Sequence, residues 1–253
     1  MRKQMLCCLA ALLLSGCGKP TEDGTLAVLW YQQSGEVRGL YEQGYELGKQ
    51  QLDQALAKGT GKPPAIVLDL DETVVDNSPY QAQVIREGAS SFALWDEWVR
   101  KAEAKALPGA LDFLRYADLK EVAIYYISNR RTSQLKDTLH NLQQLDVPQA
   151  VESHVLLRAP GEQGKDARRA AVMKTHDIVL YFGDNLSDFP GFEGKSNEER
   201  RRLAEEMKAL FGRQFILFPN PMYGHWEDAM YNYEDKTEEE KKKIRDRLLQ
   251  PFR

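Results

Sequence analysis

The chain has 253 residues, enough for one sizeable hydrophobic core or for one domain with an accessory lobe. Hydrophobic residues make up 42% and charged residues 28% of the sequence, as in ordinary soluble globular proteins. The formal net charge of −4 disfavours a nucleic-acid-binding surface, which usually carries a basic excess, so we expect no nucleic-acid polymer as a partner.

Residues 1–16 have the pattern of a signal peptide. A positive start is followed by an apolar run over residues 5–14 that is too short to span a bilayer. The run ends in Leu14-Ser15-Gly16-Cys17, which resembles the lipobox of bacterial lipoproteins, where the chain is cut before a cysteine that is then acylated. Several acyl chains on one residue anchor a protein stably. We therefore predict lipidation of Cys17, with residues 17–24 as the lipidated cysteine and a polar tether. An ordinary secretory signal with a chance cysteine is the alternative.

Cleavage before Cys17 would define the mature chain. It would remove Cys7 and Cys8, so we expect neither a disulfide nor a thiol for catalysis or metal binding. Gly18 follows the cysteine, and no aspartate retention signal is visible. The predicted location is therefore the bacterial outer membrane, as a lipoprotein that faces the periplasm or the cell surface.

From residue 34 onward, helical and strand patterns alternate along the chain. Apolar residues at helical spacing predict helices over 34–58, 92–104, 108–116, 132–145, 165–174, 197–210 and 237–249. Short apolar runs predict strands from Ile66 and over 122–127, 154–157, 177–182 and 214–218. This alternation predicts an α/β protein with a parallel sheet and helices on both sides.

The strand that begins at Ile66 runs into two aspartates, Asp69 and Asp71, one residue apart. Side chains at i and i+2 of an extended backbone leave the same face, roughly 6.5 Å apart. Both carboxylates should therefore point to one place beyond the strand, where open parallel sheets bind ligands. Burying unpaired charge is costly, so the strand would gain nothing structurally from them. A hydrated turn that uses aspartate as a turn residue is the alternative.

Two further strands are expected to end in polar residues. The strand over 122–127 runs into Ser128 and Asn129, and the strand over 177–182 runs into a segment that contains Asp184 and Asp188. The carboxyl ends of parallel strands meet at one edge of a sheet, so these side chains should lie near Asp69 and Asp71. The coincidence of three polar strand ends carries more weight than any single motif.

Such residues can hydrolyse a phosphate monoester, which requires a nucleophile, a proton donor and positive charge. Asp69 can act as the nucleophile and form an aspartyl-phosphate. Asp71 can give a proton to the leaving oxygen and later take one from the attacking water. Two carboxylates and a phosphate dianion repel one another, so we expect a cation. Mg²⁺ prefers oxygen ligands and keeps several waters, so a few carboxylates suffice.

The candidate Mg²⁺ ligands are the carboxylates of Asp69 and Asp184 and the backbone carbonyl of Asp71. Asp188 is a further ligand or an orienting group. With Lys165 and Mg²⁺ present and Asp71 protonated, the formal charges of the site sum to about zero before substrate binds.

Ser128 and the backbone amide of Asn129 can bind phosphate oxygens, and Lys165 can supply a point charge. Ser128 could instead cap the following helix. Lys165 has basic rivals nearby in the sequence, namely Arg168, Arg169 and Lys174.

The same residues carry a resemblance to a family. Asp69-Leu70-Asp71-Glu72-Thr73, Ser128, Lys165 and Gly183-Asp184-Asn185 with Asp188 are similar, in order, to the four motifs of the haloacid dehalogenase-like phosphatases with four aspartates. Longer strings over 71–80, 127–130 and 183–189 look like the narrower group of bacterial class C acid phosphatases, which are related to the outer-membrane lipoprotein 5′-nucleotidase. The likeness runs from about Leu29 to Trp226.

The resemblance implies a Rossmann-like parallel sheet flanked by helices, with a smaller helical lobe. We place a single phosphatase domain at 25–253, with the α/β core at about 62–222 and the helical lobe at about 25–60, 78–106 and 223–253. The resemblance also implies dependence on Mg²⁺ and nucleoside 5′-monophosphates as substrates, and it suggests a homodimer.

In the family an aromatic pair holds the nucleotide base, and by position Trp95 and Tyr223 match that pair. Trp95 lies three residues before Trp98 and could instead belong to a helix-packing core. His225 stands where a small residue is expected, which leaves the base preference open.

The predicted function is a Mg²⁺-dependent acid phosphatase that hydrolyses phosphate monoesters, nucleoside 5′-monophosphates above all. One alternative is a non-catalytic surface lipoprotein that uses the acidic cluster and the aromatic residues to hold haem or a cation. Another is a phosphotransferase that passes the phosphoryl group to an alcohol acceptor.

Overall fold

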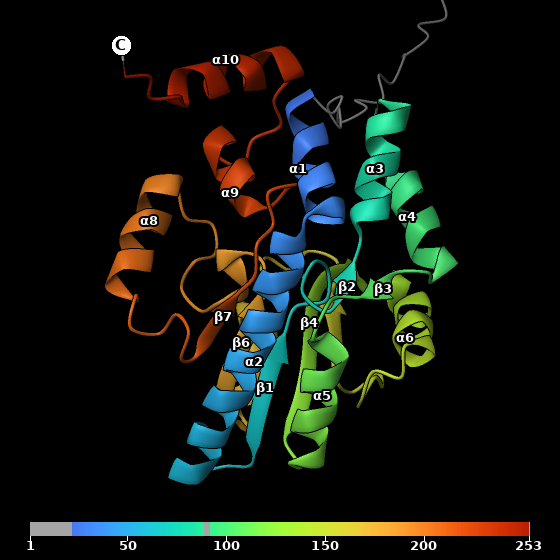
Figure 1. Ribbon diagram of the computed structural model, residues 1–253, viewed down its shortest axis with the longest axis vertical. Coiled ribbons are helices and arrows are strands. Elements are labelled where there is room, and N and C mark those ends of the chain that lie inside the picture. Colours follow the sequence, from blue (N-terminus) through green and yellow to red (C-terminus); the bar gives the residue numbers. More distant parts are fainter. Residues whose placement is uncertain (1–21, 89–91, 253) are drawn as a thin grey trace, which may run out of the picture.

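The computed structural model describes residues 22–88 and 92–252. Five parallel strands form one sheet in the order β5-β4-β1-β6-β7, with β1 in the centre (Figure 1). Their bounds are β1 Pro64–Leu68, β4 Ala123–Arg131, β5 Val155–Arg158, β6 Asp177–Gly183 and β7 Phe215–Leu217. A central strand is covered on both faces, so β1 is apolar at consecutive positions and its last four residues are buried.

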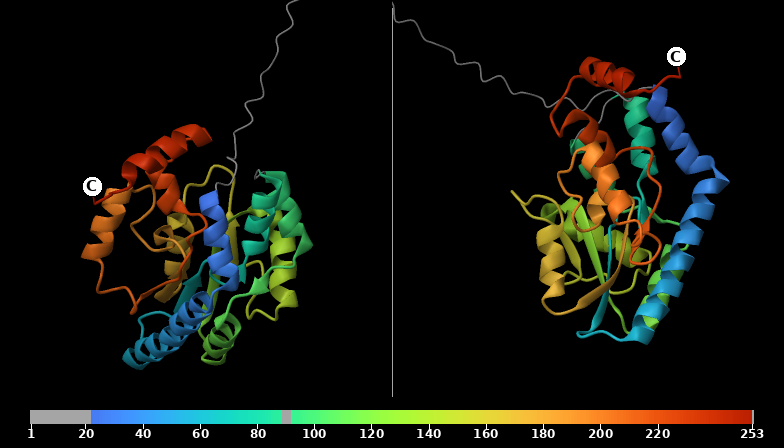
Figure 2. Two further views of the ribbon diagram at one scale, coloured as in Figure 1. Left: turned by 45° about the horizontal axis from the view of Figure 1, so that its top comes forward. Right: turned by 90° about the vertical axis from the view of Figure 1, so that its left-hand side faces the viewer.

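Helices cover both faces of the sheet. Their bounds are α2 Gly35–Lys58, α5 Ala110–Leu119 and α6 Leu135–Gln144 on one face, and α7 Asp166–Met173 and α8 Asn197–Glu206 on the other. The first face is packed through residues such as Tyr45, Phe113 and Leu142, and the second through Val172 and Leu203. The right-hand view of Figure 2 shows α2 and α7 on opposite sides of the sheet. The predicted α/β class is confirmed.

A smaller group of helices lies beyond the end of the sheet where the strands finish (Figure 1, upper part). It contains α1 Glu22–Gln33, α3 Ser78–Glu87, α4 Phe92–Lys101, α9 His225–Asp228 and α10 Glu238–Leu248. A short antiparallel pair, β2 Val75–Asp76 and β3 Lys105–Ala106, joins this group to the core. No helix among the described residues is both long enough and apolar enough to cross a membrane.

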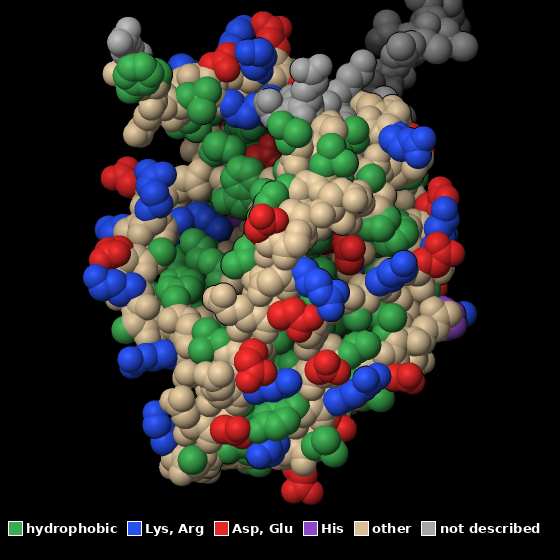
Figure 3. Space-filling model, in the orientation of Figure 1, with side chains coloured by type: hydrophobic (Ala, Val, Ile, Leu, Met, Phe, Trp, Pro, Cys, Tyr) green, Lys and Arg blue, Asp and Glu red, His purple; other side chains and the backbone are tan. Residues whose placement is uncertain are grey.

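The 24-residue helix α2 is seated directly on the sheet. Ser34 begins it, since its hydroxyl accepts a hydrogen bond from the Val37 amide at 3.3 Å. Close approach depends on Gly48, because a Cβ there would lie 2.7 Å from the ring of Phe182. The outer side of α2 is charged, with Arg38 and Glu42 paired at 3.1 Å. Figure 3 shows acidic and basic side chains interspersed over this face of the molecule.

The structure differs from the sequence-based expectation at the N-terminal side. Residues 25–60 were expected in the helical lobe, but α2 belongs to the sheet-covering layer because its buried tyrosines and Leu52 pack into the main core. The polar tether was expected to reach Gly24, whereas residues 22–24 form the first turn of α1. Cys17 and residues 18–21 lie outside the described residues. Neither α1 nor the β2–β3 pair was predicted.

The packing of α2 yields a matched test. Gly48→Ala should lower the free energy of unfolding by about 1–3 kcal/mol, because the added methyl group overpacks against Phe182. Gly39→Ala, in the same helix with nothing within 4 Å of its Cβ, should raise it by about 0.5–1 kcal/mol through helix propensity. Urea unfolding of both variants measures the pair. Equal effects at the two positions would contradict this account of the helix–sheet contact.

Candidate active site

The acidic residues predicted from two strand ends do meet. Asp69 directly follows β1 and Asp184 directly follows β6, and these strands are paired neighbours. The Asp69 amide donates to the Phe182 carbonyl at 3.0 Å, which extends the pairing to the strand tips. Carboxylate oxygens of Asp69, Asp184 and Asp188 all lie within 4.8 Å of one another. The sheet topology therefore brings three carboxylates to one place at its carboxyl edge.

A tight turn after β6 brings Asp188 into this cluster. The turn contains the short 3₁₀ helix η2, Leu186–Asp188, and the Asn185 amide donates to Asp188 Oδ2 at 2.9 Å. Gly183 precedes the turn, and a Cβ at this position would lie only 2.3 Å from the Asp188 Cβ. The glycine is thus required for Asp188 to fold back toward the strand end.

Lys165 is the one cation inside the carboxylate cluster among the described residues. Its Nζ donates to Asp69 Oδ1 and, at 2.7 Å, to Asp188 Oδ1, and the side chain is 4% exposed. The basic rivals lie elsewhere: the guanidiniums of Arg168 and Arg169 bind mainly backbone carbonyls, and Lys174 is exposed. Of these four basic residues, Lys165 is therefore the one placed to offset charge in the cluster, and its binding of phosphate stays a prediction.

The electrostatics of the cluster favour the binding of a positive charge. Burial raises the pKa of Asp69 to about 7; the Lys165 charge opposes this rise, and Asp188 and Asp71 add to it. Burial, with Asp188 and Asp69 nearby, also holds the pKa of Asp184 well above its usual range. The neighbouring carboxylates outweigh the burial of Lys165 and raise its pKa. One lysine among three clustered carboxylates leaves a net negative charge, which an oxygen-coordinated divalent metal ion would balance.

The Asp184 carboxylate is oriented by two side chains that the sequence analysis did not identify. Asn220 Nδ2 donates to Asp184 Oδ2 at 2.8 Å, and Thr73 Oγ1 donates to Asp184 Oδ1 at 3.4 Å. Asn220 follows β7 and Thr73 belongs to the loop after β1. Second partners of this kind fix the direction in which a carboxylate offers its oxygens.

Asp71 was expected to share a site with Asp69, but its carboxylate has different partners. It accepts hydrogen bonds from Arg130 Nε at 2.9 Å, Asn77 Nδ2 at 2.8 Å and Ser128 Oγ at 3.0 Å. The side chain therefore lies outside the group of carboxylates that can hold a metal ion. Only its backbone carbonyl, as predicted, remains a candidate ligand.

Ser128 and Asn129 were expected just after a strand, but they lie within it, because β4 continues to Arg131. The pairing of β4 with β5 is irregular between Ser128 and Arg131. Asn129 Oδ1 accepts from Arg168 Nη2 at 2.9 Å, and Arg168 Nη1 donates to the Ser128 carbonyl at 2.6 Å. Arg168 therefore binds both the backbone and a side chain of this end of β4.

The two aromatic candidates lie beside the loop after β1. Trp95 packs edge-on against Tyr80, with ring centroids 5.0 Å apart, and its ring lies 5.5 Å from the guanidinium carbon of Arg130. Tyr223 donates its hydroxyl hydrogen bond to the buried carboxylate of Glu72. Burial and the charge of Asp71 hold the pKa of Glu72 well above its usual range. Both aromatics therefore contact residues adjacent to, or bound to, Asp71.

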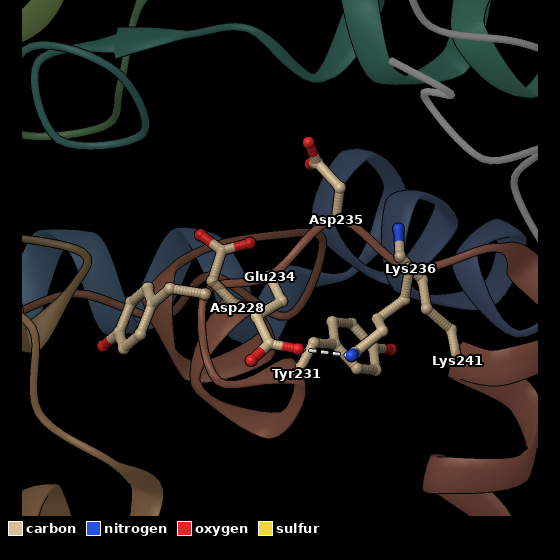
Figure 4. A pocket seen from close by; sticks show the side chains of 7 residues that line it. Asp228, Tyr231, Glu234, Asp235, Lys236 and Lys241 are labelled. Atoms are coloured by element: carbon tan, nitrogen blue, oxygen red, sulfur yellow. Dashed lines mark hydrogen bonds and ion pairs between the residues drawn. The ribbon is translucent and has the colours of Figure 1, made fainter. Parts of the chain in front are cut away.

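A separate cavity of about 210 Å³ lies in the C-terminal segment (Figure 4). It is lined by charged and tyrosine side chains, namely Asp228, Tyr231, Tyr233, Glu234, Asp235, Lys236 and Lys241. None of the predicted site residues lines it. The chemistry-bearing groups are instead those at the carboxyl edge of the sheet.

The raised carboxyl pKa values predict a pH-dependent stability. In EDTA the folded protein binds more protons at Asp69 and Asp184 than the unfolded chain, so the free energy of unfolding should fall as pH rises from about 3.8 to 7. Asp184→Asn should flatten this fall, by up to about 1.4 kcal/mol per pH unit. Thermal unfolding across this range measures both proteins. If the stability of the wild type rises with pH and equals that of the variant, Asp69 and Asp184 do not share buried charge in the folded protein.

Comparison with known proteins agrees with this geometry. A family model described as HAD superfamily, subfamily IIIB (acid phosphatase) matches residues 17–226. The structure of a class C acid phosphatase from Bacillus anthracis is 55% identical, covers 91% of this chain and 98% of its own, and superposes with a TM-score of 0.89. A tungstate-bound structure of the same kind of enzyme from that organism is 56% identical at the same coverage, with a TM-score of 0.90. The chain therefore belongs to the acid phosphatases of HAD subfamily IIIB, which are phosphoric monoester hydrolases.

Proposed function

We propose that the protein is a Mg²⁺-dependent acid phosphatase that works through an aspartyl-phosphate on Asp69. The observation that carries this proposal is the position of Asp69: a buried carboxylate at the tip of the central strand, bound by Lys165 and grouped with two further carboxylates. The tungstate in the Bacillus anthracis relative supports the proposal, because tungstate is a tetrahedral oxyanion like phosphate.

The residues present fit the reaction. Asp69 attacks the phosphorus while Asp71 gives its proton to the leaving oxygen, and the P–O bond to that oxygen breaks. Lys165, held by Asp69 and Asp188, offsets negative charge on the transferring group. Water then attacks the aspartyl-phosphate and gives its proton to Asp71, which restores both side chains.

The carboxylates of Asp69, Asp184 and Asp188 would hold the metal ion. We propose Mg²⁺, because a hard cation with oxygen ligands suits this donor set. When bound, it would offset the charge of the phosphate dianion and of the clustered carboxylates. Asn220 and Thr73 keep Asp184 turned toward the cluster.

The nucleophile is tested by Asp69→Asn. Assayed with a nucleoside 5′-monophosphate and Mg²⁺, this variant should lose at least about 10³-fold in kcat, because an amide cannot form the acyl phosphate. Phosphate release measures the loss. Asp166→Asn, at an exposed aspartate of α7, is the control and should retain activity. Turnover by Asp69→Asn within tenfold of the wild type would end the covalent mechanism.

Nucleoside 5′-monophosphates are the proposed substrates. The Trp95 ring lies beside the guanidinium of Arg130, which binds the Asp71 carboxylate. The Tyr223 hydroxyl binds Glu72, the residue that follows Asp71 in the loop. The rings of Trp95 and Tyr223 would give a nucleobase two stacking surfaces near Asp71, the proposed proton donor. Stacking tolerates different bases, so the base preference stays open.

The stacking role is tested by Tyr223→Ala and Tyr223→Phe. Loss of the ring should raise KM for a nucleoside 5′-monophosphate about 5- to 150-fold, the equivalent of about 1–3 kcal/mol, and leave KM for ribose 5-phosphate nearly unchanged. The phenylalanine variant keeps the ring and loses only the bond to Glu72, so its KM should change much less. Steady-state kinetics on both substrates decide the matter. Equal changes for the two substrates would exclude base stacking by Tyr223.

Lipidation of Cys17, an outer-membrane location and a homodimer remain predictions. Transfer of the phosphoryl group to an alcohol acceptor also remains one, since the same residues would permit it. A non-catalytic holder of haem or of a cation is not favoured, because the family and the similar structures are those of acid phosphatases.

A further inference from the structure

Arg130 is a buried arginine near the end of β4 to which the reaction above gives no part. Its Nε donates to Asp71 Oδ1 at 2.9 Å, and its Nη2 lies 2.8 Å from the same oxygen. Its Nη1 donates to Thr138 Oγ1 and its Nη2 to Asn77 Oδ1, both at 3.3 Å. The guanidinium plane also has the Trp95 ring beside it. These contacts fix the guanidinium from several sides.

The two oxygens of the Asp71 carboxylate are held differently. Oδ1 receives the two Arg130 nitrogens and Asn77 Nδ2. Oδ2 receives only the Ser128 hydroxyl, at 3.0 Å, among the contacts of the described residues. The Ser128 hydroxyl in turn accepts a bond from the Arg130 backbone amide at 3.0 Å. Arg130 therefore holds Oδ1 directly through its side chain and Oδ2 indirectly through Ser128.

This asymmetry decides which oxygen can carry a proton. A carboxylate oxygen offers about two lone-pair positions, and the nitrogen donors at Oδ1 occupy them. A proton on Oδ1 would displace a bond to a buried guanidinium, which is costly. Oδ2 has room for one. The proton that Asp71 transfers would then lie on Oδ2.

We propose that Arg130 is a positioning residue that fixes the Asp71 carboxyl with Oδ2 toward the leaving oxygen. The inference rests on the proposed function, in which Asp71 is the proton donor. As the Asp69–phosphorus bond forms and the ester P–O bond breaks, the electron pair of the broken bond stays on the leaving oxygen, which takes the Oδ2 proton. Arg130 keeps its own protons throughout and acts on the reaction through the Asp71 carboxyl, to which it is bound.

The test compares leaving groups in Arg130→Lys. Lysine keeps the charge but has neither the planar fork that grips Oδ1 nor a plane to lie on Trp95. Ribose 5-phosphate releases a basic alkoxide that must be protonated and has no base to stack on Trp95, whereas p-nitrophenyl phosphate releases a stable phenolate. We expect kcat/KM, which reports the steps up to loss of the leaving group, to fall about 10²-fold for ribose 5-phosphate and less than about fivefold for the aryl ester.

Arg168→Lys is the matched control. Arg168 is also buried and contacts the same strand end, but it binds the Ser128 carbonyl, Asn129 and Glu162, not Asp71. Its replacement should affect both substrates alike. An Arg130→Lys protein that loses activity equally on both substrates, or on neither, would overturn the inference.

Two further variants keep the test decisive. Asp71→Asn should itself lose more activity on the alkyl ester than on the aryl ester, and if it does not, Asp71 is not the proton donor. If Asp71→Asn shows this dependence and Arg130→Lys does not, only the role proposed for Arg130 is wrong. If Arg130→Lys does not fold, Thr138→Val removes one guanidinium contact while filling the same space. It should lower kcat/KM for ribose 5-phosphate a few-fold and leave that for the aryl ester unchanged, and equal losses count against the inference.

Discussion

Three carboxylates and one lysine share a buried place at the end of the central strand, and much of the structure serves to hold them there. Asp69, Asp184 and Asp188 would repel one another and leave such a site if the backbone allowed it. The backbone does not, because Asp69 and Asp184 follow paired strands and Gly183 lets the next turn fold tightly back. The sheet thus fixes the unfavourable charge in place, and this charge would favour the binding of a cation.

The loop between β1 and β2 is held by side chains of helix α2. Tyr41 donates a hydrogen bond to the Glu72 carbonyl, and Tyr45 donates to the Thr73 carbonyl at 2.6 Å. Both tyrosines are fully buried on α2, the helix seated on the sheet through Gly48. A long helix without any reacting group of its own therefore sets the backbone that carries Asp71. Pre-organised support of this kind keeps a catalytic group within the small tolerance that catalysis allows.

The surroundings of Asp69 and Asp71 differ, which suits the two residues to the distinct roles proposed for them. Asp69 faces Lys165 and two carboxylates, where a cation and a phosphate dianion can be balanced. Asp71 faces Arg130, Asn77 and Ser128, which orient it without bringing it into the cluster. Adjacent aspartates in different environments can divide nucleophilic attack and proton transfer between them. The sequence spacing brings both to the strand tip, and their different partners are consistent with the different roles proposed for them.

Several elements follow from local pattern alone. The apolar run of β1, the helix from residue 35 and the polar ends of β4 and β6 were all predictable, because helix and strand periodicities are properties of neighbouring residues. Asp69, Asp184 and Lys165 were predicted by the same reasoning with the aid of motif resemblance. The short β2–β3 pair was not, since two-residue strands carry no periodic signal.

What the sequence determined by itself was the fold class and the identity of the acidic residues, since both depend on order along the chain. Only the tertiary structure decided how those residues are partnered. Arg130 lies two residues after Ser128, yet nothing in the sequence distinguishes an arginine that binds Asp71 from one that faces solvent. Asn220 lies 36 residues from Asp184 and reaches it only because β7 pairs with β6. Such contacts depend on where distant strands end in space, and local residue patterns do not encode that position.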